Sequence, residues 1–305
     1  MLCELEDCNK ENLLLLKRFE MIMANNGNTE RSIEAFIKYE IPLFLKFIKD
    51  KPLTEIESLD VENFIFYCRS ERKNTATTIC RKYTALNSFF KHLIKKRAIN
   101  IQNPLDMIDK PKERPKLREP LTVDEVNRIF DYIDNAPKLN NRLRAGAVYA
   151  LFLASGVRLS ELLKLKKSSL DMDNMQFIVM GKGMKPRICV FDEFAKARIK
   201  KYLDSRLDSL DPLILSREKN EISGKALQMQ IRNVAKACGI KSRVFPHKLR
   251  HTAAHTAREN NVPIEDIQVF LGHASPATTA MIYARGDIRK IRNKFSGMYD
   301  KNKGD

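Results

Sequence analysis

The chain has 305 residues, of which 43% are apolar, including 16 phenylalanines and 8 tyrosines. At about 150 residues per domain this length predicts two domains. The apolar content excludes a disordered or collagen-like chain. The charge is strongly positive, because 55 Lys and Arg residues oppose 38 Asp and Glu residues to give +17. Such a balance fits a polyanionic partner, either nucleic acid or an anionic membrane surface.

The first residues are acidic, with no base before Lys10, so they do not resemble a secretory signal. The uncharged residues 145–157 are too few to cross a bilayer and predict a buried helix. None of the cysteines has the spacing of metal ligands. We therefore expect free thiols in a reducing cytoplasm, and no metal.

Prolines and alternating charges between residues 103 and 120 mark a boundary in the chain. Proline ends helices and restricts the residue before it, so residues 109–119 are predicted to form a basic, semi-extended linker. The linker separates a domain of residues 1–108 from one of residues 120–305. The charge changes sign within the first domain, since residues 1–60 carry a net −4 and residues 61–118 a net +9.

The first domain is predicted to be a helical bundle, with helices over residues 30–49, 60–70 and 75–96. Ile79 and Leu86 belong to an apolar stripe on the last helix, and basic and hydroxyl side chains follow another face. Such a face can enter a DNA groove and contact phosphates. A solvated surface is the alternative. The residues predicted to contact DNA are Arg81, Lys82, Ser88, Lys91 and Lys95.

The second domain mixes helices with a small β-structure. A capping box at Thr122 begins one helix, and residues 145–164 predict another with a break near Gly156. The short apolar runs 175–180 and 187–191 predict a β-hairpin, after which the chain is helical again. The fold class is therefore mainly α, with a small β-sheet or hairpin in the C-terminal domain.

Two places in this domain could serve phosphodiester chemistry, which needs a nucleophile, cations for the phosphate oxygens and an acid for the leaving oxygen. Arg158 begins a helix after Gly156, and its planar fork can bind two phosphate oxygens. Glu161 could hold that guanidinium, although for this segment alone an ion pair on the surface is the more usual explanation of the spacing. Lys182 lies at the hairpin tip between glycines and could act as a general acid, unless it is merely solvated.

Two further places lie nearer the C-terminus. Pro246 begins a helix that puts His247 and Arg250 on one face, where they could bind phosphate or manage a proton. His273 follows a helix-ending glycine, and Tyr283 lies at the far end of the next short helix. The alternative for this last region is a helical hairpin with a packed tyrosine.

Taken together and in this order, the motifs resemble the tyrosine recombinase (phage integrase) family. The segments "SGVRLSELLKL", "GKGMKPR", "PHKLRHTAAHTA" and "FLGHASPATTAMIYA" have the family's spacings across residues 120–290. The family's N-terminal SAM-like, core-binding domain is also recognisable, in "SIEAFIKYEIPLFLKFI" and in "TTICRKYTALNSFFKHLIKKRAINIQNPLDMIDKPK". The resemblance extends over nearly the whole chain.

The resemblance implies a site-specific recombinase that cuts and rejoins DNA through a 3′-phosphotyrosyl intermediate, without ATP, metal or other cofactor. Tyr283 would be the nucleophile, and Lys182 would protonate the leaving 5′ oxygen. Arg158 and Arg250 would bind the scissile phosphate. The supporting roles implied are proton management by His247, a phosphate hydrogen bond from His273 and an architectural role for Glu161.

The implied partner is double-stranded DNA with specific sites, and the implied assembly is a homotetramer on two such sites. An accessory protein could also take part. A C-terminal tail bearing Ile288, Ile291 and Phe295 would contact a neighbouring subunit. The ten residues from His273 to Tyr283 are one more than in Xer-type resolvases. Integration, excision and resolution therefore all stay open, as does a role in the chromosome or in a mobile element. Two alternatives are a non-catalytic DNA-binding factor of the same fold and a nicking-closing enzyme like the type IB topoisomerases.

Overall fold

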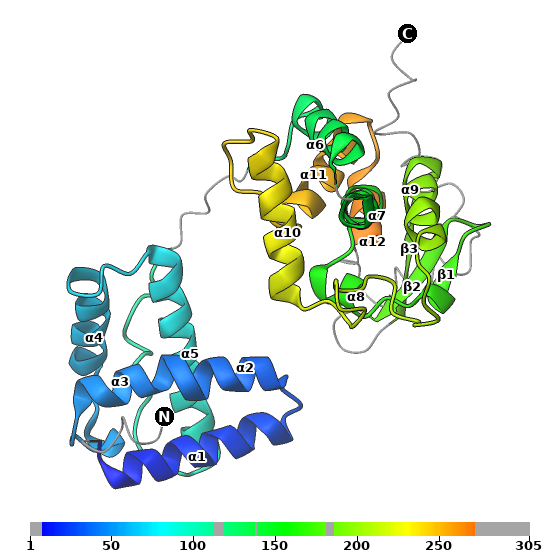
Figure 1. The fold of residues 1–305 in the computed structure, drawn as a ribbon. Coiled ribbons are helices and arrows are strands. Elements are labelled where there is room, and N and C mark those ends of the chain that lie inside the picture. The colour runs from blue at the N-terminus through cyan, green and yellow to red at the C-terminus, as the bar shows by residue number, and fades with distance from the viewer. Residues whose placement is uncertain (1–7, 113–118, 138, 181–185, 272–305) are drawn as a thin grey trace. The chain divides into compact units, whose positions relative to one another are not determined.

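The computed structural model consists of two compact units, Met1–Leu117 and Arg118–Asp305 (Figure 1). Their boundary lies within the stretch predicted to be the linker, while the finer three-part division of the chain stays a prediction. The residues that the structure describes are 8–112, 119–137, 139–180 and 186–271.

The first unit is helical throughout its described part, as predicted. The longest helix, α5, begins after the N-cap Thr75, whose side chain accepts a hydrogen bond from the Thr78 amide. The elements are α1 (Lys10–Asn25), α2 (Glu30–Glu34), the π-helix η2 (Ala35–Glu40), α3 (Ile41–Ile48), the 3₁₀ turn η3 (Leu53–Glu55), α4 (Ser58–Ser70) and α5 (Ala76–Lys95).

The helix predicted over residues 30–49 is present but has a π-helical centre in η2. Pro42, near the start of α3, has no amide hydrogen to donate, and its ring conflicts with the carbonyl one turn earlier. A wider turn before the proline relieves that conflict, which accounts for η2. The sequence shows the proline but not how the preceding turn adapts to it.

Phenylalanine rings from several helices form the core of the first unit. The rings of Phe19 and Phe89 meet edge to face at 5.1 Å between centroids, and those of Phe44 and Phe64 meet in the same way at 5.2 Å. These arrangements suit the charge distribution of aromatic rings. The Tyr83 hydroxyl donates to the carbonyls of residues 105 and 108, which holds the end of this unit against α5.

The second unit contains seven helices in its described part and a three-stranded antiparallel sheet of order β1-β2-β3. The strands β2 and β3 are the predicted hairpin, whereas the two-residue β1 is too short for the sequence to indicate. The elements are α6 (Val123–Asn135), α7 (Leu139–Ser155), α8 (Leu159–Leu163), the 3₁₀ turn η4 (Lys167–Ser169), β1 (Leu170–Asp171), β2 (Gln176–Met180), β3 (Pro186–Val190), α9 (Glu193–Asp204), α10 (Gly224–Ala237), α11 (Pro246–Glu259) and α12 (Ile264–Leu271).

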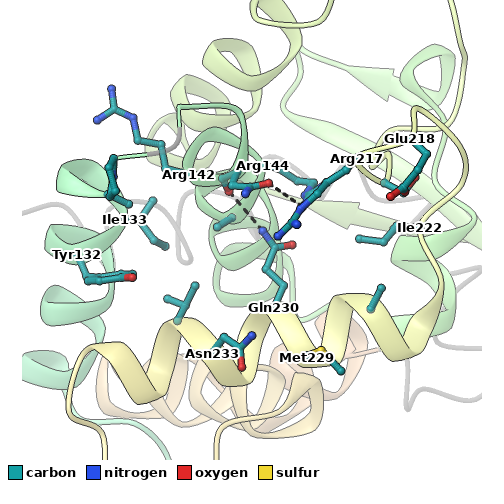
Figure 2. A pocket seen from close by; sticks show the side chains of 17 residues that line it. Tyr132, Ile133, Arg142, Arg144, Arg217, Glu218, Ile222, Met229, Gln230 and Asn233 are labelled. Atoms are coloured by element: carbon teal, nitrogen blue, oxygen red, sulfur yellow. Dashed lines mark hydrogen bonds between the residues drawn. The ribbon is translucent and has the colours of Figure 1, made fainter.

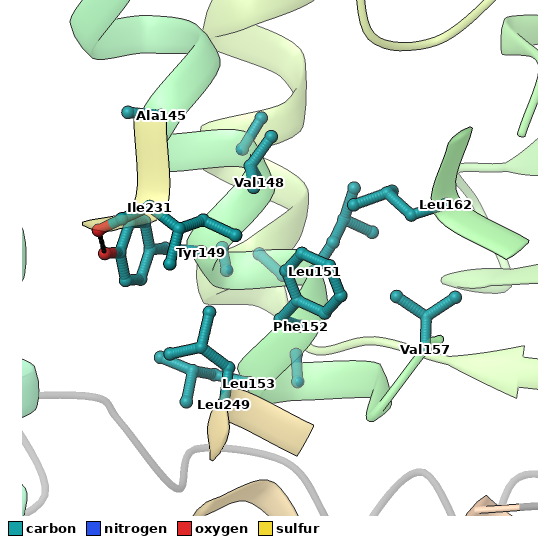
Figure 3. Packing of buried hydrophobic residues seen from close by; sticks show 14 of the residues in the cluster. Ala145, Val148, Tyr149, Leu151, Phe152, Leu153, Val157, Leu162, Ile231 and Leu249 are labelled. Carbon is teal, nitrogen blue, oxygen red and sulfur yellow. Dashed lines mark hydrogen bonds between the residues drawn. The ribbon is translucent and has the colours of Figure 1, made fainter. Parts of the chain in front are cut away.

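Helix α7 is the centre of this unit, with α6, α9, α10 and α11 around it (Figure 1). Every residue from 145 to 157 is buried, as the uncharged run predicts. Figure 3 shows the packing, in which Phe152 lies deep in the cluster and the Tyr149 hydroxyl donates to the Ile231 carbonyl at 2.7 Å. A buried hydroxyl needs such an acceptor, and the bond joins α7 to α10.

Membrane spans, cysteines and metal ligands can be examined in the described part of the chain. No helix in residues 8–112, 119–137, 139–180 and 186–271 is long and apolar enough to cross a membrane. The five cysteines in these ranges are free thiols. The same ranges contain no cluster of three or more His, Cys, Asp or Glu side chains able to hold a metal.

Candidate active site

A sharp turn after α7 places the first predicted arginine. Gly156 adopts φ +57°, a left-handed conformation that suits glycine, and α7 ends there. Arg158 then forms the N-cap of α8, and Glu161 lies one turn into that helix. The Glu161 carboxylate accepts two bonds from Arg158, one from its amide and one from Nη1, both at 2.7 Å. Glu161 is buried, so this contact is not a surface ion pair.

Arg250, on the first turns of α11, reaches the same turn. It is 5% exposed, and its guanidinium donates to the carbonyls of Gly156 and Leu271. The structure therefore brings together three of the predicted residues, Arg158, Glu161 and Arg250, from α8 and α11. A second arginine at the turn adjoining Arg158 concentrates positive charge there.

A third arginine, which our sequence analysis did not single out, completes the cluster. Arg187 on β3 is buried, and its Nη2 donates to Glu161 at 2.7 Å while its Nη1 donates to the Phe270 carbonyl at 2.9 Å. Its position carries a signal, because Arg187, Cys189 and Phe191 alternate on the inner face of the hairpin. A charged residue in that row is unusual and points to a buried partner.

The electrostatics of the cluster favour anion binding. Burial lowers the pKa of Arg250 to about 10, with help from the nearby charges of Arg158 and Arg187. Burial would raise the pKa of Glu161, but the hydrogen bonds and charges of Arg187 and then Arg158 outweigh it and hold the pKa below its usual range. Three arginines against one carboxylate leave a net charge of +2 near neutral pH.

The predicted His247 lies on the first turn of α11, one turn before Arg250, and its side chain is exposed. The histidines that follow are not arranged as a metal site. Their rings lie 6.5 Å apart, and the Nδ1 of His255 lies 3.4 Å from a carboxylate oxygen of Glu259. His247 is thus close in sequence to Arg250 of the cluster, and its side chain is accessible to solvent.

Three predicted residues, Lys182, His273 and Tyr283, lie outside the described part of the chain, so their roles stay predictions. Described elements lie near two of them in the sequence. Strand β3 begins four residues after Lys182, and α12 ends two residues before His273. Both of those elements contact the cluster through Arg187, Arg250 and their carbonyl partners.

The predicted DNA-contacting face on α5 is exposed for most of its length. Arg81, Lys91 and Lys95 are exposed, and Ser88 is half-buried. Arg81 also contacts Glu40, with 2.6 Å between its Nε and the carboxylate. Because Arg81 is 66% exposed, this contact leaves it at the surface. We retain these four residues as a proposed DNA-contacting face.

The structure corrects the prediction for Lys82. This lysine is 7% exposed, and its ammonium donates to Glu40 at 3.1 Å, so it belongs to the packing of the unit. Helical spacing accounts for this, because Lys82 lies between Ile79 and Leu86 at intervals of three and four residues and therefore on the buried side. A basic side chain in the core stripe marks a buried ion pair rather than a DNA contact.

A separate cavity lies among α6, the start of α7, α10 and residues 216–222 (Figure 2). Ile133 and Met229 form part of an apolar wall. Arg144 donates to the Leu215 carbonyl at 2.8 Å. The lining includes none of the residues predicted to act in catalysis. The cavity adjoins the start of α7, whereas the arginine cluster lies at its end.

Comparison with known proteins identifies the kind of fold that holds the cluster. A profile described as the phage integrase family matches residues 119–289, more than half of the chain. The chain belongs to the phage integrase family. A second profile, described as the N-terminal SAM-like domain of phage integrases, matches residues 15–100 of this integrase-family protein.

Individual relatives agree with the family. The tyrosine recombinase XerC of Thermodesulfovibrio yellowstonii is 31% identical over 295 residues, which cover 93% of this chain and 95% of the relative. The integrase of the transposon Tn1549, solved with transposon right end DNA, has a TM-score of 0.71 and 16% identity, covering 90% of this chain and 98% of the other. A lambda integrase tetramer on a Holliday junction has a TM-score of 0.69 and 19% identity, covering 86% and 76%.

Proposed function

We infer that this chain is a site-specific tyrosine recombinase, an enzyme that breaks and rejoins DNA. The class of enzyme follows from the family match and from relatives that are named as tyrosine recombinases. These relatives align with more than nine-tenths of the chain. The observation that carries the chemistry is the cluster of Arg158 and Arg250 around the turn at Gly156, ordered by the buried Glu161. Such a cluster can neutralise charge that develops on a phosphate.

In the proposed reaction, a phosphodiester bond of the DNA is exchanged for a bond between the same phosphorus and Tyr283. The Tyr283 oxygen attacks phosphorus, the bond from phosphorus to the 5′ oxygen breaks, and a 3′-phosphotyrosyl link forms. Lys182 gives its proton to the departing 5′ oxygen, which becomes a hydroxyl. Rejoining reverses these steps with the 5′ hydroxyl of another strand, so the bond is conserved and no energy-rich co-substrate is consumed.

The arginines explain how a tyrosine could serve at neutral pH. An unperturbed tyrosine has a pKa of about 10, so its hydroxyl is a weak nucleophile near pH 7. Arg158 and Arg250 would bind the non-bridging oxygens and stabilise the charge of the transition state. His247, at the exposed start of α11, would accept the proton that the Tyr283 hydroxyl loses. His273 would donate a hydrogen bond to the phosphate.

We propose double-stranded DNA with specific sites as the substrate and a homotetramer on two sites as the working assembly. The solved lambda integrase tetramer on a Holliday junction supports that assembly for this fold. The tail bearing Ile288, Ile291 and Phe295 is the proposed contact between subunits. A non-catalytic factor would not need Arg158, Glu161 and Arg250 in one ordered cluster. The recombinase relatives argue against a nicking-closing topoisomerase.

Denaturing capture tests the proposal. Tagged protein is expressed in its host, the cells are lysed in SDS, and DNA that stays attached to the purified protein is sequenced. Wild-type protein should retain DNA from one or a few sites, and Tyr283→Phe should retain none. Tyr132→Phe, a change at a partly exposed tyrosine on α6, is the matched control and should behave as wild type. DNA retained by Tyr283→Phe would contradict the assignment of the nucleophile.

A further inference from the structure

The buried arginine of the hairpin, Arg187, binds the same carboxylate as Arg158. We propose that Arg187 is a positioning residue, which acts through the Glu161 carboxylate to fix the guanidinium of Arg158 for the scissile phosphate. The proposal rests on the proposed function, and Arg187 itself is not placed on the DNA. It assigns a reason for a charged residue within the core face of a β-strand.

The setting of Arg187 is apolar on the sheet side. The residue opposite it in the hairpin register is Val179, and Cys189 lies two residues further along the same face of β3. The Arg187 side chain is only 9% exposed. A cation taken out of water in this way is unfavourable unless it gains a paired, hydrogen-bonded anion. Glu161 is that anion.

The Glu161 carboxylate is divided between the two arginines. Its Oε2 accepts from Arg187 Nη2 and from the Arg158 amide, each at 2.7 Å. Its Oε1 accepts from Arg158 Nη1 at 2.7 Å and from Arg187 Nε at 3.4 Å. Arg187 thus binds both oxygens and sets the plane of the carboxylate. The Arg158 guanidinium binds Oε1, and the Arg158 amide binds Oε2, so the plane of the carboxylate determines where that guanidinium lies.

Arg187 also keeps Glu161 charged. Among the influences on the pKa of Glu161, burial raises it most, and the hydrogen bond and charge of Arg187 are the largest that lower it, ahead of those of Arg158. Among the described residues, the other ionisable groups that act on the pair are Arg158 at the start of α8, Arg250 on α11 and Cys189 on β3. Burial raises the pKa of the Cys189 thiol to about 11, so it is neutral here.

A second contact links Arg187 to the end of another helix. Its Nη1 donates to the Phe270 carbonyl at 2.9 Å, and Arg250 donates to the next carbonyl, that of Leu271. Carbonyls at the end of a helix lack partners within the helix, so these bonds fix the end of α12. In sequence, His273 follows two residues later. One side chain therefore joins β3, α8 and α12. In sequence, Lys182 precedes β3 and Arg158 is the N-cap of α8.

The test is cleavage by purified full-length Arg187→Met, measured under single-turnover conditions on a DNA site recovered by denaturing capture. Cleavage by the wild type on this DNA establishes the proposed function separately. We then expect Arg187→Met to cleave about 10- to 100-fold more slowly, the size of effect that a small misplacement of a catalytic group causes. Its DNA affinity should match that of the wild type.

Arg198→Met is the matched control, because Arg198 also binds a carboxylate through two bonds of 2.8 Å, to Asp134, on the outer side of the unit. Both variants lose an arginine fork and some stability. Only Arg187→Met should lose cleavage at a temperature where circular dichroism shows both to be folded. Equal loss of cleavage in the two variants, or a parallel loss of DNA binding, would overturn the proposal.

The pH profile separates positioning from a general structural defect. Without Arg187, burial raises the pKa of Glu161, so the carboxyl takes up a proton as the pH falls and releases Arg158. The deficit of Arg187→Met relative to wild type should therefore be largest at low pH and shrink as the pH rises. Glu161→Gln, which cannot titrate, should show a constant deficit.

Arg187→Lys restores the charge without the fork and should recover part of the rate and abolish the excess deficit at low pH. A deficit of Arg187→Met that is the same at every pH, or no gain on going to lysine, would contradict the proposal.

Discussion

The Arg250 guanidinium donates to the carbonyl of Gly156, the residue at which the central helix α7 ends and the chain turns toward Arg158. Two residues implied in phosphate binding therefore depend on one turn: Arg250 is held by it, and Arg158 follows it. The same turn contacts the end of α12, since a Cβ built on Gly156 would lie 2.9 Å from side-chain atoms of Phe270 and Leu271.

The first prediction concerns that turn. Gly156→Ala combines a left-handed backbone with two close contacts, so we expect it to lower the free energy of unfolding by about 1–3 kcal/mol. Gly239→Ala is the control. Gly239 has φ +71° but no side-chain atom nearer than 4.0 Å to a built Cβ, and it should cost less. Urea denaturation of both variants makes the comparison. Equal losses would show that the contact with α12 is unimportant.

The second prediction concerns the fork of Arg158. A lysine keeps the positive charge but cannot bind Glu161 and present two parallel donors to a phosphate. Arg158→Lys should cleave far more slowly than wild type while binding DNA with nearly the same affinity. Gel-shift titration and single-turnover cleavage on one DNA give both values. An equal fall in binding and cleavage would make Arg158 a structural anchor.

The third prediction concerns acid stability. The pKa of Glu161 is depressed in the folded chain, so its contribution to stability is fully present above its unfolded pKa, about 4.3, and is lost as the pH falls through the folded value. Wild-type stability should decline below about pH 4.5 more steeply than that of Glu161→Gln. Urea midpoints from pH 3 to pH 7 test this. Parallel curves would show that Glu161 is not held by the arginines in solution.

The fourth prediction concerns the proposed DNA-contacting face. Lys91 and Lys95 are exposed on α5, and each phosphate contact contributes about 0.9 to the slope of log affinity against log salt. Lys91→Gln with Lys95→Gln should reduce the slope by about 2. The matched control neutralises two exposed lysines of α1, Lys10 and Lys17, and should leave the slope unchanged. An unchanged slope in the α5 variant would remove this face from the interface.

An element of the fold can be predicted from the sequence when the contacts that determine it lie between residues close in the chain. The capping box at Thr122 and the hairpin pairing are decided within a few residues, and both agree with the structure. The π-helical segment is an adjustment of the backbone to Pro42, and the short β1 depends on its pairing with β2, and spacing alone shows neither.

The same distinction applies to the site. Arg158 and Glu161 are one helical turn apart, so their contact could be predicted, although not its burial. Arg187 is 26 residues from Glu161, and only the folded hairpin brings them together. Lys82 differs in kind, since helical spacing already places it in the apolar stripe, where a basic side chain indicates a buried ion pair.

The most direct test of the account is to locate the covalent bond between protein and DNA. Purified protein is allowed to cleave a DNA site recovered by denaturing capture, digested with nuclease and protease, and analysed by mass spectrometry. We predict a nucleotide 3′-phosphate on the peptide that contains Tyr283, and none on the other tyrosine peptides. The same adduct on a different residue, or DNA cleavage that leaves no adduct, would contradict the central claim.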